Sequence, residues 1–172
     1  MAGSLELPQF DQVWLMPSGD RLDKHIGGAT DQDRLAMLRL VAQHRFLGDP
    51  RLMVSDFELN LPRPSSTYQT FHALQRAYPT TRFSFAYGAD AYASMPSWPH
   101  GQELQKILPV VLFGQKAVRL PGGEQVLPLP LPGPLQDLSS TAARQAVKRG
   151  ERPDSVLSTP VLGYVASHQL YR

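Results

Sequence analysis

The chain has 172 residues, of which 42% are hydrophobic and 19% charged, so it is long enough to bury the core of one domain. It contains no cysteine, which excludes disulfides and thiolate metal sites, and it has no long apolar run or signal-like start, so we expect a cytoplasmic protein without a membrane partner. The net charge is +2, and the basic residues are scattered apart from a group within residues 144–152; this argues against nucleic-acid binding but leaves room for a local anion site.

The first half of the chain reads as alternating strands and helices. Residues 13–16 form a continuous apolar run, which is typical of a strand covered on both faces. A helix is predicted from Thr30 to about residue 44, followed by a weak strand at 52–54. After Pro64, either Ser65 or Ser66 can cap the next helix.

The second half continues the alternation. We predict, in chain order, a strand at 83–87, a helix near 102–108, a strand at 109–113, a short edge strand at 125–129, a helix from 139–141 to Gly150, and a last helix capped by Thr159 with Pro160 at its first position. Strands and helices in this order predict an α/β fold, a Rossmann-like parallel sheet with helices on both faces. Ligands bind such sheets at the carboxyl edge, so the turns after residues 16, 87 and 113 and the segment into Ser139 are the candidate ligand loops.

The turn Gly88-Ala89-Asp90 places a carboxylate directly after the central strand. At the carboxyl edge of a sheet, such a residue can contact a ligand. The alternative is that Asp90 only caps the next helix.

The segment Ser139-Ser140-Thr141-Ala142-Ala143-Arg144 carries the strongest chemical signal. It places hydroxyls and unpaired N–H groups at the positive end of a helix, and Arg144 falls on the same face as Ser140 and Thr141. This pattern predicts a phosphate clamp. The alternative is an ordinary serine-capped helix with a solvent-facing arginine.

An ordered series of short motifs extends over residues 11 to 171 and, taken as a set, resembles the bacterial nicotinate-nucleotide adenylyltransferases of the nucleotidyltransferase superfamily. The series is Val13-Trp14-Leu15-Met16-Pro17, Lys24, Arg34-Leu35-Ala36-Met37, Glu58-Leu59, Ser65-Ser66-Thr67-Tyr68-Gln69-Thr70, Gly88-Ala89-Asp90, Trp98, Leu138-Ser139-Ser140-Thr141 with Arg144, Val161 with Tyr164-Val165, and His168 with Leu170-Tyr171. Each motif alone is weak, and the specificity lies in their order and spacing.

The resemblance implies an enzyme of NAD biosynthesis. In this family the phosphate of nicotinate mononucleotide attacks the α-phosphorus of ATP, giving deamido-NAD and pyrophosphate. The nucleophile is already an anion, so positioning and charge neutralisation carry the catalysis and no general base is needed. ATP is the co-substrate, and Mg²⁺ is expected to travel mainly on the phosphates with few protein ligands.

The resemblance also implies roles for single residues, and it assigns no metal ligand. The ATP-binding residues by position are Ser139, Ser140, Thr141, Arg144, Gly88 and Asp90, and the catalytic cations are Arg144 and Lys24. The residues expected at the acceptor are Thr67, Trp98 and Asp90. The flat indole of Trp98 can stack on a pyridine ring, although half-buried packing is its ordinary role.

The chain departs from the family at its front and after Phe113. The family's first strand and its His-x-Gly-His motif are absent, and Gly114-Gln115-Lys116 stands where the family often has arginine. We therefore expect residues 1–172 to be a single nucleotidyltransferase-like domain, incomplete at its N-terminus. Without that strand, the strands at 13–16 and 83–87 should either part, close on each other, or receive a partner chain between them.

Two other functions stay open at this point. The chain can be a non-catalytic or vestigial nucleotide-binding protein, or an adenylyltransferase with a different acceptor such as phosphopantetheine. Trp98 and the segment around Thr67 favour an aromatic acid over a pantetheine arm. The sequence does not decide the oligomeric state, so a homo-oligomer also stays open.

Overall fold

The computed structural model describes residues 10–19, 27–47, 49–113, 126–129 and 140–172. The chain divides into two compact units, unit 1 (Met1–Arg63 with Asp137–Arg172) and unit 2 (Pro64–Gln136), and each is described by itself. The expectation of a single domain stays a prediction. In the described part of the chain, no helix is long and apolar enough to cross a membrane.

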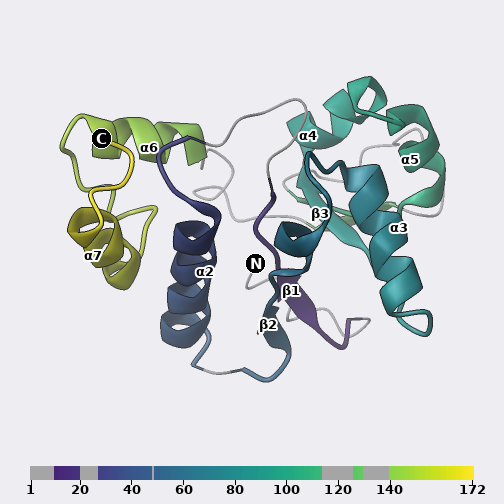
Figure 1. Ribbon diagram of the computed structural model, residues 1–172, viewed down its shortest axis with the longest axis horizontal. Helices are drawn as coiled ribbons and strands as arrows, with labels where there is room; N and C mark the ends of the chain where they lie inside the picture. The colour runs from purple at the N-terminus through teal and green to yellow at the C-terminus, as the bar shows by residue number, and fades with distance from the viewer. Residues whose placement is uncertain (1–9, 20–26, 48, 114–125, 130–139) are drawn as a thin grey trace. The chain divides into compact units, whose positions relative to one another are not determined.

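Unit 1 combines a two-stranded parallel sheet with helices (Figure 1). The strands are β1 (Val13–Leu15) and β2 (Leu52–Val54), with Val13 opposite Leu52. The helices are α2 (Asp31–Arg45), the 3-10 helix η1 (Phe57–Asn60), α6 (Ser140–Lys148) and α7 (Thr159–Ser167). Helix α2 packs against both β2 and α7, so it links the sheet to the C-terminal helix.

Unit 2 contains a three-stranded parallel sheet in the order β3, β4, β5 (Figure 1). The strands are β3 (Phe85–Gly88), β4 (Val110–Phe113) and β5 (Val126–Leu129). The helices are α3 (Thr67–Ala77), α4 (Ala89–Ser94), the 3-10 helix η2 (Met95–Ser97) and α5 (Gly101–Ile107). The central strand β4 buries Val110, Val111 and Leu112, as its unbroken apolar run predicts.

The strands predicted at 13–16 and 83–87 belong to different sheets. Among the described residues β1 pairs only with β2, and β3 pairs only with β4. The two strands lie in different units, so the expected alternatives for how they meet stay predictions.

Two helices begin with the local hydrogen bonds that their sequences predict. At α2, the Thr30 hydroxyl accepts from the Asp33 N–H at 3.1 Å, and the Asp33 carboxylate accepts from the Thr30 N–H at 2.8 Å. At α3, Ser66 and Gln69 form the same reciprocal pair, which decides between the two candidate serines.

Several element boundaries differ from the prediction. The central strand starts at Phe85 rather than residue 83. Residues 89–97, which carried no element in the prediction, form α4 and η2. Helix α7 starts one residue early: the Ser158 carbonyl accepts from the Leu162 N–H at 3.0 Å, so Ser158 is the cap and Pro160 the second helical residue.

Candidate functional site

The predicted phosphate clamp lies at the start of α6, in unit 1. Ser140 and Thr141 are exposed in the first turn, and the guanidinium of Arg144 donates from Nη2 to Thr141 Oγ1 at 3.3 Å. The expected shared face is therefore confirmed for Thr141 and Arg144. Exposed hydroxyls beside a cation at a helix start can receive an anion, because the N–H groups of that turn carry partial positive charge.

Tyr171, the residue before the last, lies near this clamp, a feature that sequence reasoning did not single out as functional. Its backbone N–H donates to the Gly28 carbonyl at 3.0 Å, and a Cβ at Gly28 would lie 2.7 Å from the tyrosine ring. Burial raises the pKa of the Tyr171 phenol, while the positive charges of Arg144 and Arg34 act in the opposite sense. Arg144 on α6 and Arg34 on α2 therefore both act on the pKa of this phenol, against the charge of Asp33, which raises it.

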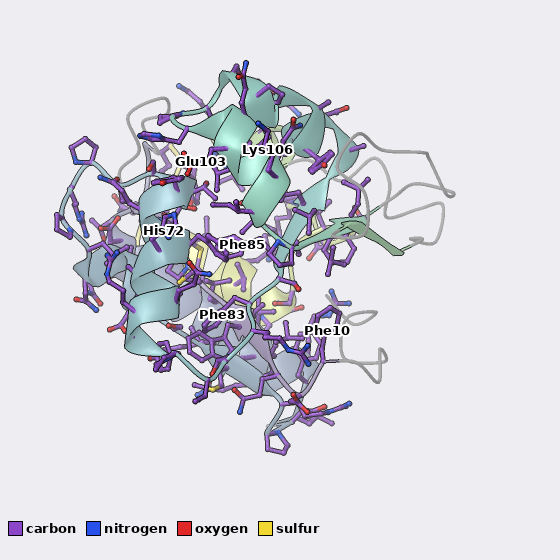
Figure 2. All side chains as sticks on the ribbon, turned by 90° about the vertical axis from the view of Figure 1, so that its right-hand side faces the viewer. Phe10, His72, Phe83, Phe85, Glu103 and Lys106 are labelled. Atoms are coloured by element: carbon purple, nitrogen blue, oxygen red, sulfur yellow. The ribbon has the colours of Figure 1, made fainter. Side chains whose placement is uncertain are left out.

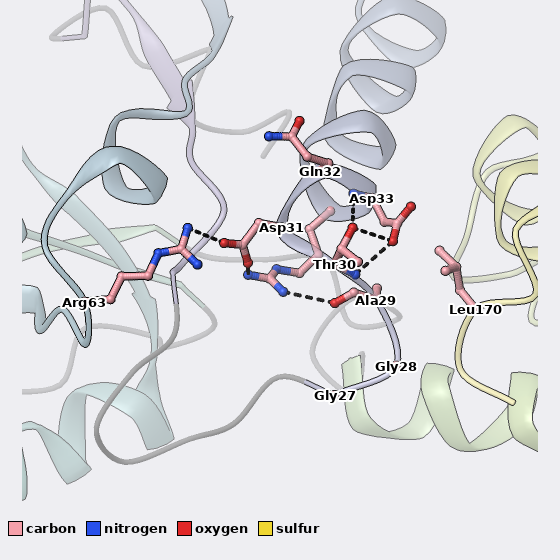
Figure 3. Close-up of a pocket in the computed structure, with 10 residues that line it drawn as sticks. Gly27, Gly28, Ala29, Thr30, Asp31, Gln32, Asp33, Arg63 and Leu170 are labelled. Atoms are coloured by element: carbon pink, nitrogen blue, oxygen red, sulfur yellow. Dashed lines mark hydrogen bonds and ion pairs between the residues drawn. The ribbon is translucent and has the colours of Figure 1, made fainter.

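A hollow of about 650 Å³ opens at the start of α2 (Figure 3). Asp31 forms ion pairs with both Arg34 and Arg63, and Arg34 also donates from Nη2 to the Ser18 carbonyl at 2.7 Å. Both cations that line this hollow are thus paired with one carboxylate. The i,i+3 spacing of Asp31 and Arg34 could have been found in the sequence, but no local pattern indicates Arg63.

Asp33, also at the start of α2, ties that helix to α7. Its carboxylate accepts from the Thr30 hydroxyl at 2.7 Å and from the Tyr164 hydroxyl at 3.0 Å. These hydrogen bonds, with Thr30 contributing most, hold the pKa of Asp33 below its usual value. Tyr164 in turn stacks on His168, with ring centroids 3.9 Å apart. The series of contacts that begins at Asp33 therefore reaches the end of α7.

In unit 2, Gly88 and Asp90 occupy the junction between β3 and α4. Gly88 ends the strand and is the N-cap of α4, which has no side-chain cap, and Asp90 lies exposed in the first turn. The alternative reading of Asp90 as the cap is therefore wrong, because a cap residue must precede the helix. Among the residues that the structure describes, no atom lies within 4 Å of where a Cβ of Gly88 would be, so the strand end is open there in the described part of the chain.

Thr67 and Trp98 lie on separate elements of unit 2. Thr67 is the first residue of α3 and is half-buried, and Trp98 follows η2 and is also half-buried. The indole packs edge-on against Tyr87, with centroids 5.5 Å apart, and its Nε1 donates to Ser94 Oγ at 3.2 Å. Trp98 therefore has a packing role on one side, which does not exclude a stacking role on the other.

A second hollow, of about 460 Å³, lies beside Trp98 and is lined also by His100, Glu103 and Lys106. Tyr68, the residue after Thr67, donates from its hydroxyl to Glu103 Oε1 at 3.1 Å. This hydrogen bond is the main cause that raises the pKa of the Tyr68 phenol. Sequence reasoning missed the contact between Tyr68 and Glu103 because these two residues are 35 positions apart and no periodic pattern links them.

The predicted site residues thus fall into two sets. Ser140, Thr141 and Arg144 lie in unit 1, and Thr67, Gly88, Asp90 and Trp98 lie in unit 2. Ser139 and Lys24 lie outside the described residues. The functional roles of all these residues stay predictions.

Comparison with known proteins gives relatives in sequence but no matching family model. A protein of Synechococcus sp. (strain JA-3-3Ab) named "Probable nicotinate-nucleotide adenylyltransferase" is 33% identical over 172 residues, which cover 94% of this chain and 81% of the relative. A protein of Shewanella pealeana with the same name is 29% identical, over 95% of this chain and 83% of the relative.

The fold has close matches among solved structures. Plasmodium falciparum nicotinic acid mononucleotide adenylyltransferase complexed with NaAD matches with a TM-score of 0.82 at 15% identity, over 98% of this chain and 87% of that chain. The same enzyme complexed with APC matches with a TM-score of 0.77 at 14% identity and the same coverage. The expected α/β fold with parallel strands and helices is confirmed.

Proposed function

Because this chain belongs to the nicotinate-nucleotide adenylyltransferase family, as 33% identity over 94% of its length shows, we propose that it transfers the adenylyl group of ATP to nicotinate mononucleotide. A phosphate oxygen of the mononucleotide attacks the α-phosphorus of ATP. The bond between the α-phosphorus and the bridging oxygen breaks, and pyrophosphate leaves with that oxygen. The products are deamido-NAD and pyrophosphate.

The contact of Arg144 with Thr141 is the observation that best supports the ATP half of this proposal. The guanidinium is held 3.3 Å from a hydroxyl at a helix start, where charge on a leaving pyrophosphate can be neutralised. In the proposal Ser139, Ser140 and Thr141 bind the phosphates. Arg144 stabilises the charge that develops as pyrophosphate leaves.

The acceptor half of the proposal rests on unit 2. Trp98 stacks on the pyridine ring, and Thr67, through its hydroxyl and the free N–H groups of the α3 start, holds the ring carboxylate. The open strand end at Gly88 admits the nucleotide, and Asp90 accepts from a ribose hydroxyl.

Magnesium enters the proposal only with the phosphates. Within the ranges that the structure describes, no group of three or more His, Asp or Glu side chains could hold a metal ion. Mg²⁺ keeps several of its waters and binds mainly to substrate phosphates, so the proposal assigns it no protein ligand. When bound, Mg²⁺ would neutralise phosphate charge, and Lys24 is the further cation that we propose for this role.

A second candidate function is nucleotide binding without turnover. The five histidines of the sequence are His25, His44, His72, His100 and His168, and none stands in a His-x-Gly-His motif. The family resemblance implies that this motif holds the ATP phosphates. The phosphate helix α6 and the aromatic residue Trp98 could bind nucleotides without it.

The deciding experiment measures pyrophosphate release by a coupled assay, with ATP and Mg²⁺ and three acceptors offered separately: nicotinate mononucleotide, nicotinamide mononucleotide and phosphopantetheine. Turnover with the first acceptor supports the proposal. Turnover only with phosphopantetheine assigns a different acceptor. Calorimetric binding of ATP without any turnover would establish the non-catalytic alternative.

A further inference from the structure

We propose that Tyr68 and His100 are positioning residues that set the placement of Thr67 relative to Trp98, and so shape the pocket for the pyridine ring. The inference rests on the proposed function, since it assigns those two residues to the acceptor. It concerns unit 2 alone and adds residues to which the family resemblance gave no role.

The ring of Tyr68 is enclosed by two imidazoles. It stacks on His100 with centroids 4.4 Å apart and an interplanar angle of 24°, and it meets His72 edge-on, also at 4.4 Å. Its hydroxyl donates to Glu103 Oε1 at 3.1 Å, and the other carboxylate oxygen lies 3.8 Å from His100 Nδ1. Figure 2 shows His72 on α3 and Glu103 on α5 on the same side of unit 2.

His100 belongs to the turn that carries Trp98. The Gly101 N–H donates to the Trp98 carbonyl at 2.8 Å, and the Trp98 N–H donates to the Met95 carbonyl at 2.9 Å. A Cβ at Gly101 would lie only 1.8 Å from the Met95 carbonyl oxygen, so the chain approaches too closely for any other residue. The turn is therefore tightly defined on both sides of Trp98.

His100 holds an unfavourable backbone conformation in this turn. Its φ is 57°, in the left-handed region where a residue with a Cβ is strained. Such strain persists only where the surroundings enforce it, and the stacked ring of Tyr68 is the contact that can do so here.

The consequence is a direct link between two elements of the predicted pocket. Tyr68 is the neighbour of Thr67 in the first turn of α3, and His100 is two residues from Trp98. A contact between Tyr68 and His100 therefore fixes the distance between Thr67 and Trp98, the residues that would bind the ring carboxylate and the pyridine ring. Because the His100 and Glu103 side chains are 61% and 52% exposed, the contact should affect this spacing more than overall stability.

Three variants separate these contributions. Tyr68→Ala removes the ring and the hydroxyl, Tyr68→Phe removes only the bond to Glu103, and His100→Gly removes the imidazole while relieving the positive φ. Tyr78→Ala, at the other end of α3, is the matched control. Each is also made with Trp14→Phe, which leaves Trp98 as the only tryptophan that emits.

We expect Tyr68→Ala and His100→Gly to raise the KM for nicotinate mononucleotide about three- to tenfold, with the KM for ATP unchanged. The KM of Tyr68→Phe for nicotinate mononucleotide should lie between those of the parent and of Tyr68→Ala. In the ligand-free protein, the quenching of Trp98 emission by acrylamide should differ between the parent and each of the variants Tyr68→Ala and His100→Gly. Thermal midpoints should stay near that of the parent, and Tyr78→Ala should change none of these values.

The two readouts keep this inference distinct from the proposed function. If the parent binds no pyridine mononucleotide but Tyr68→Ala changes Trp98 quenching, the proposed function fails while the positioning of Trp98 stands. Unchanged quenching in Tyr68→Ala and His100→Gly would overturn the inference. So would a parallel rise of both KM values with a lowered thermal midpoint, because that is the effect of a merely structural contact.

Discussion

The two units of this chain are stabilised by different chemistry. Unit 2 has a continuous apolar core of seven buried residues: Phe71, Tyr92, Met95, Leu104, Leu108, Val110 and Leu112. In the described part of unit 1, the apolar cluster at the C-terminal helix has three buried members, Val161, Val165 and Leu170, and polar contacts at the start of α2 supplement it. Burial of apolar area is less sensitive to pH and salt than such hydrogen bonds and ion pairs.

This difference matches the two kinds of ligand group that we assign to the units. A flat pyridine ring needs a firm apolar backing, and Trp98 packs directly against the core of unit 2. Phosphates need cations and free N–H groups, and unit 1 presents Arg144 at a helix start. Variants in unit 2 should therefore act through packing, and variants in unit 1 through charge and pH.

The largest effect is expected from Leu104→Ala in the core of unit 2. Leu104 is completely buried, so its truncation should lower the free energy of unfolding by about 2–5 kcal/mol through lost burial and a cavity. Urea denaturation measures this change. Leu47→Ala is the control, because that side chain is 89% exposed and should change stability little. A loss below about 1 kcal/mol for Leu104→Ala would contradict the assignment of a tight core to unit 2.

The second-largest effect is expected from Trp98→Ala, on the binding of nicotinate mononucleotide. If the indole stacks on the pyridine ring, calorimetry should show the binding of nicotinate mononucleotide weakened by about 1–3 kcal/mol, because a large and partly desolvated contact is lost. Trp14→Phe, on β1, serves as a control for removing a tryptophan elsewhere. Unchanged affinity in Trp98→Ala would leave this residue with a packing role only.

A somewhat smaller effect is expected from Arg144→Lys. Lysine keeps the charge but loses the planar fork, so ATP affinity should fall by about 1–2 kcal/mol while the thermal midpoint of the ligand-free protein barely moves. Arg149→Lys, in an exposed ion pair with Glu151, is the matched control and should leave ATP affinity unchanged. Strong destabilisation of the ligand-free protein by Arg144→Lys would instead identify Arg144 as a structural residue.

The smallest effect is the pH dependence contributed by Asp33. Its pKa is lowered in the folded state, so its stabilisation is present above the unfolded value of about 3.9 and is lost as pH falls through the folded value. The contribution should be below about 1 kcal/mol, because the capping contacts are largely exposed. Thermal midpoints from pH 7 to about pH 3 test it: the midpoint of Asp33→Asn should fall less steeply than that of the parent. Identical slopes would rule out this contribution.

Local sequence signals predicted the elements well and the functional geometry only in part. The capping boxes pair Thr30 with Asp33 and Ser66 with Gln69, and each pair lies only three positions apart. Such hydrogen bonds depend on the local sequence and can be predicted from it. The contact of Arg144 with Thr141 is equally local. Helix α4 was missed because it has six residues and no side-chain cap, which leaves no periodicity to detect.

The sequence by itself determined most of the order of strands and helices, the family and the position of helix α6, because each depends on residue types at short or ordered spacings. Only the tertiary structure decided which distant side chains meet: Tyr68 with Glu103 across 35 residues, and Asp33 with Tyr164 across 131. It also decided that β1 and β3 belong to different sheets. Such contacts depend on how packed elements bring side chains together, and packing leaves no periodic trace along the chain.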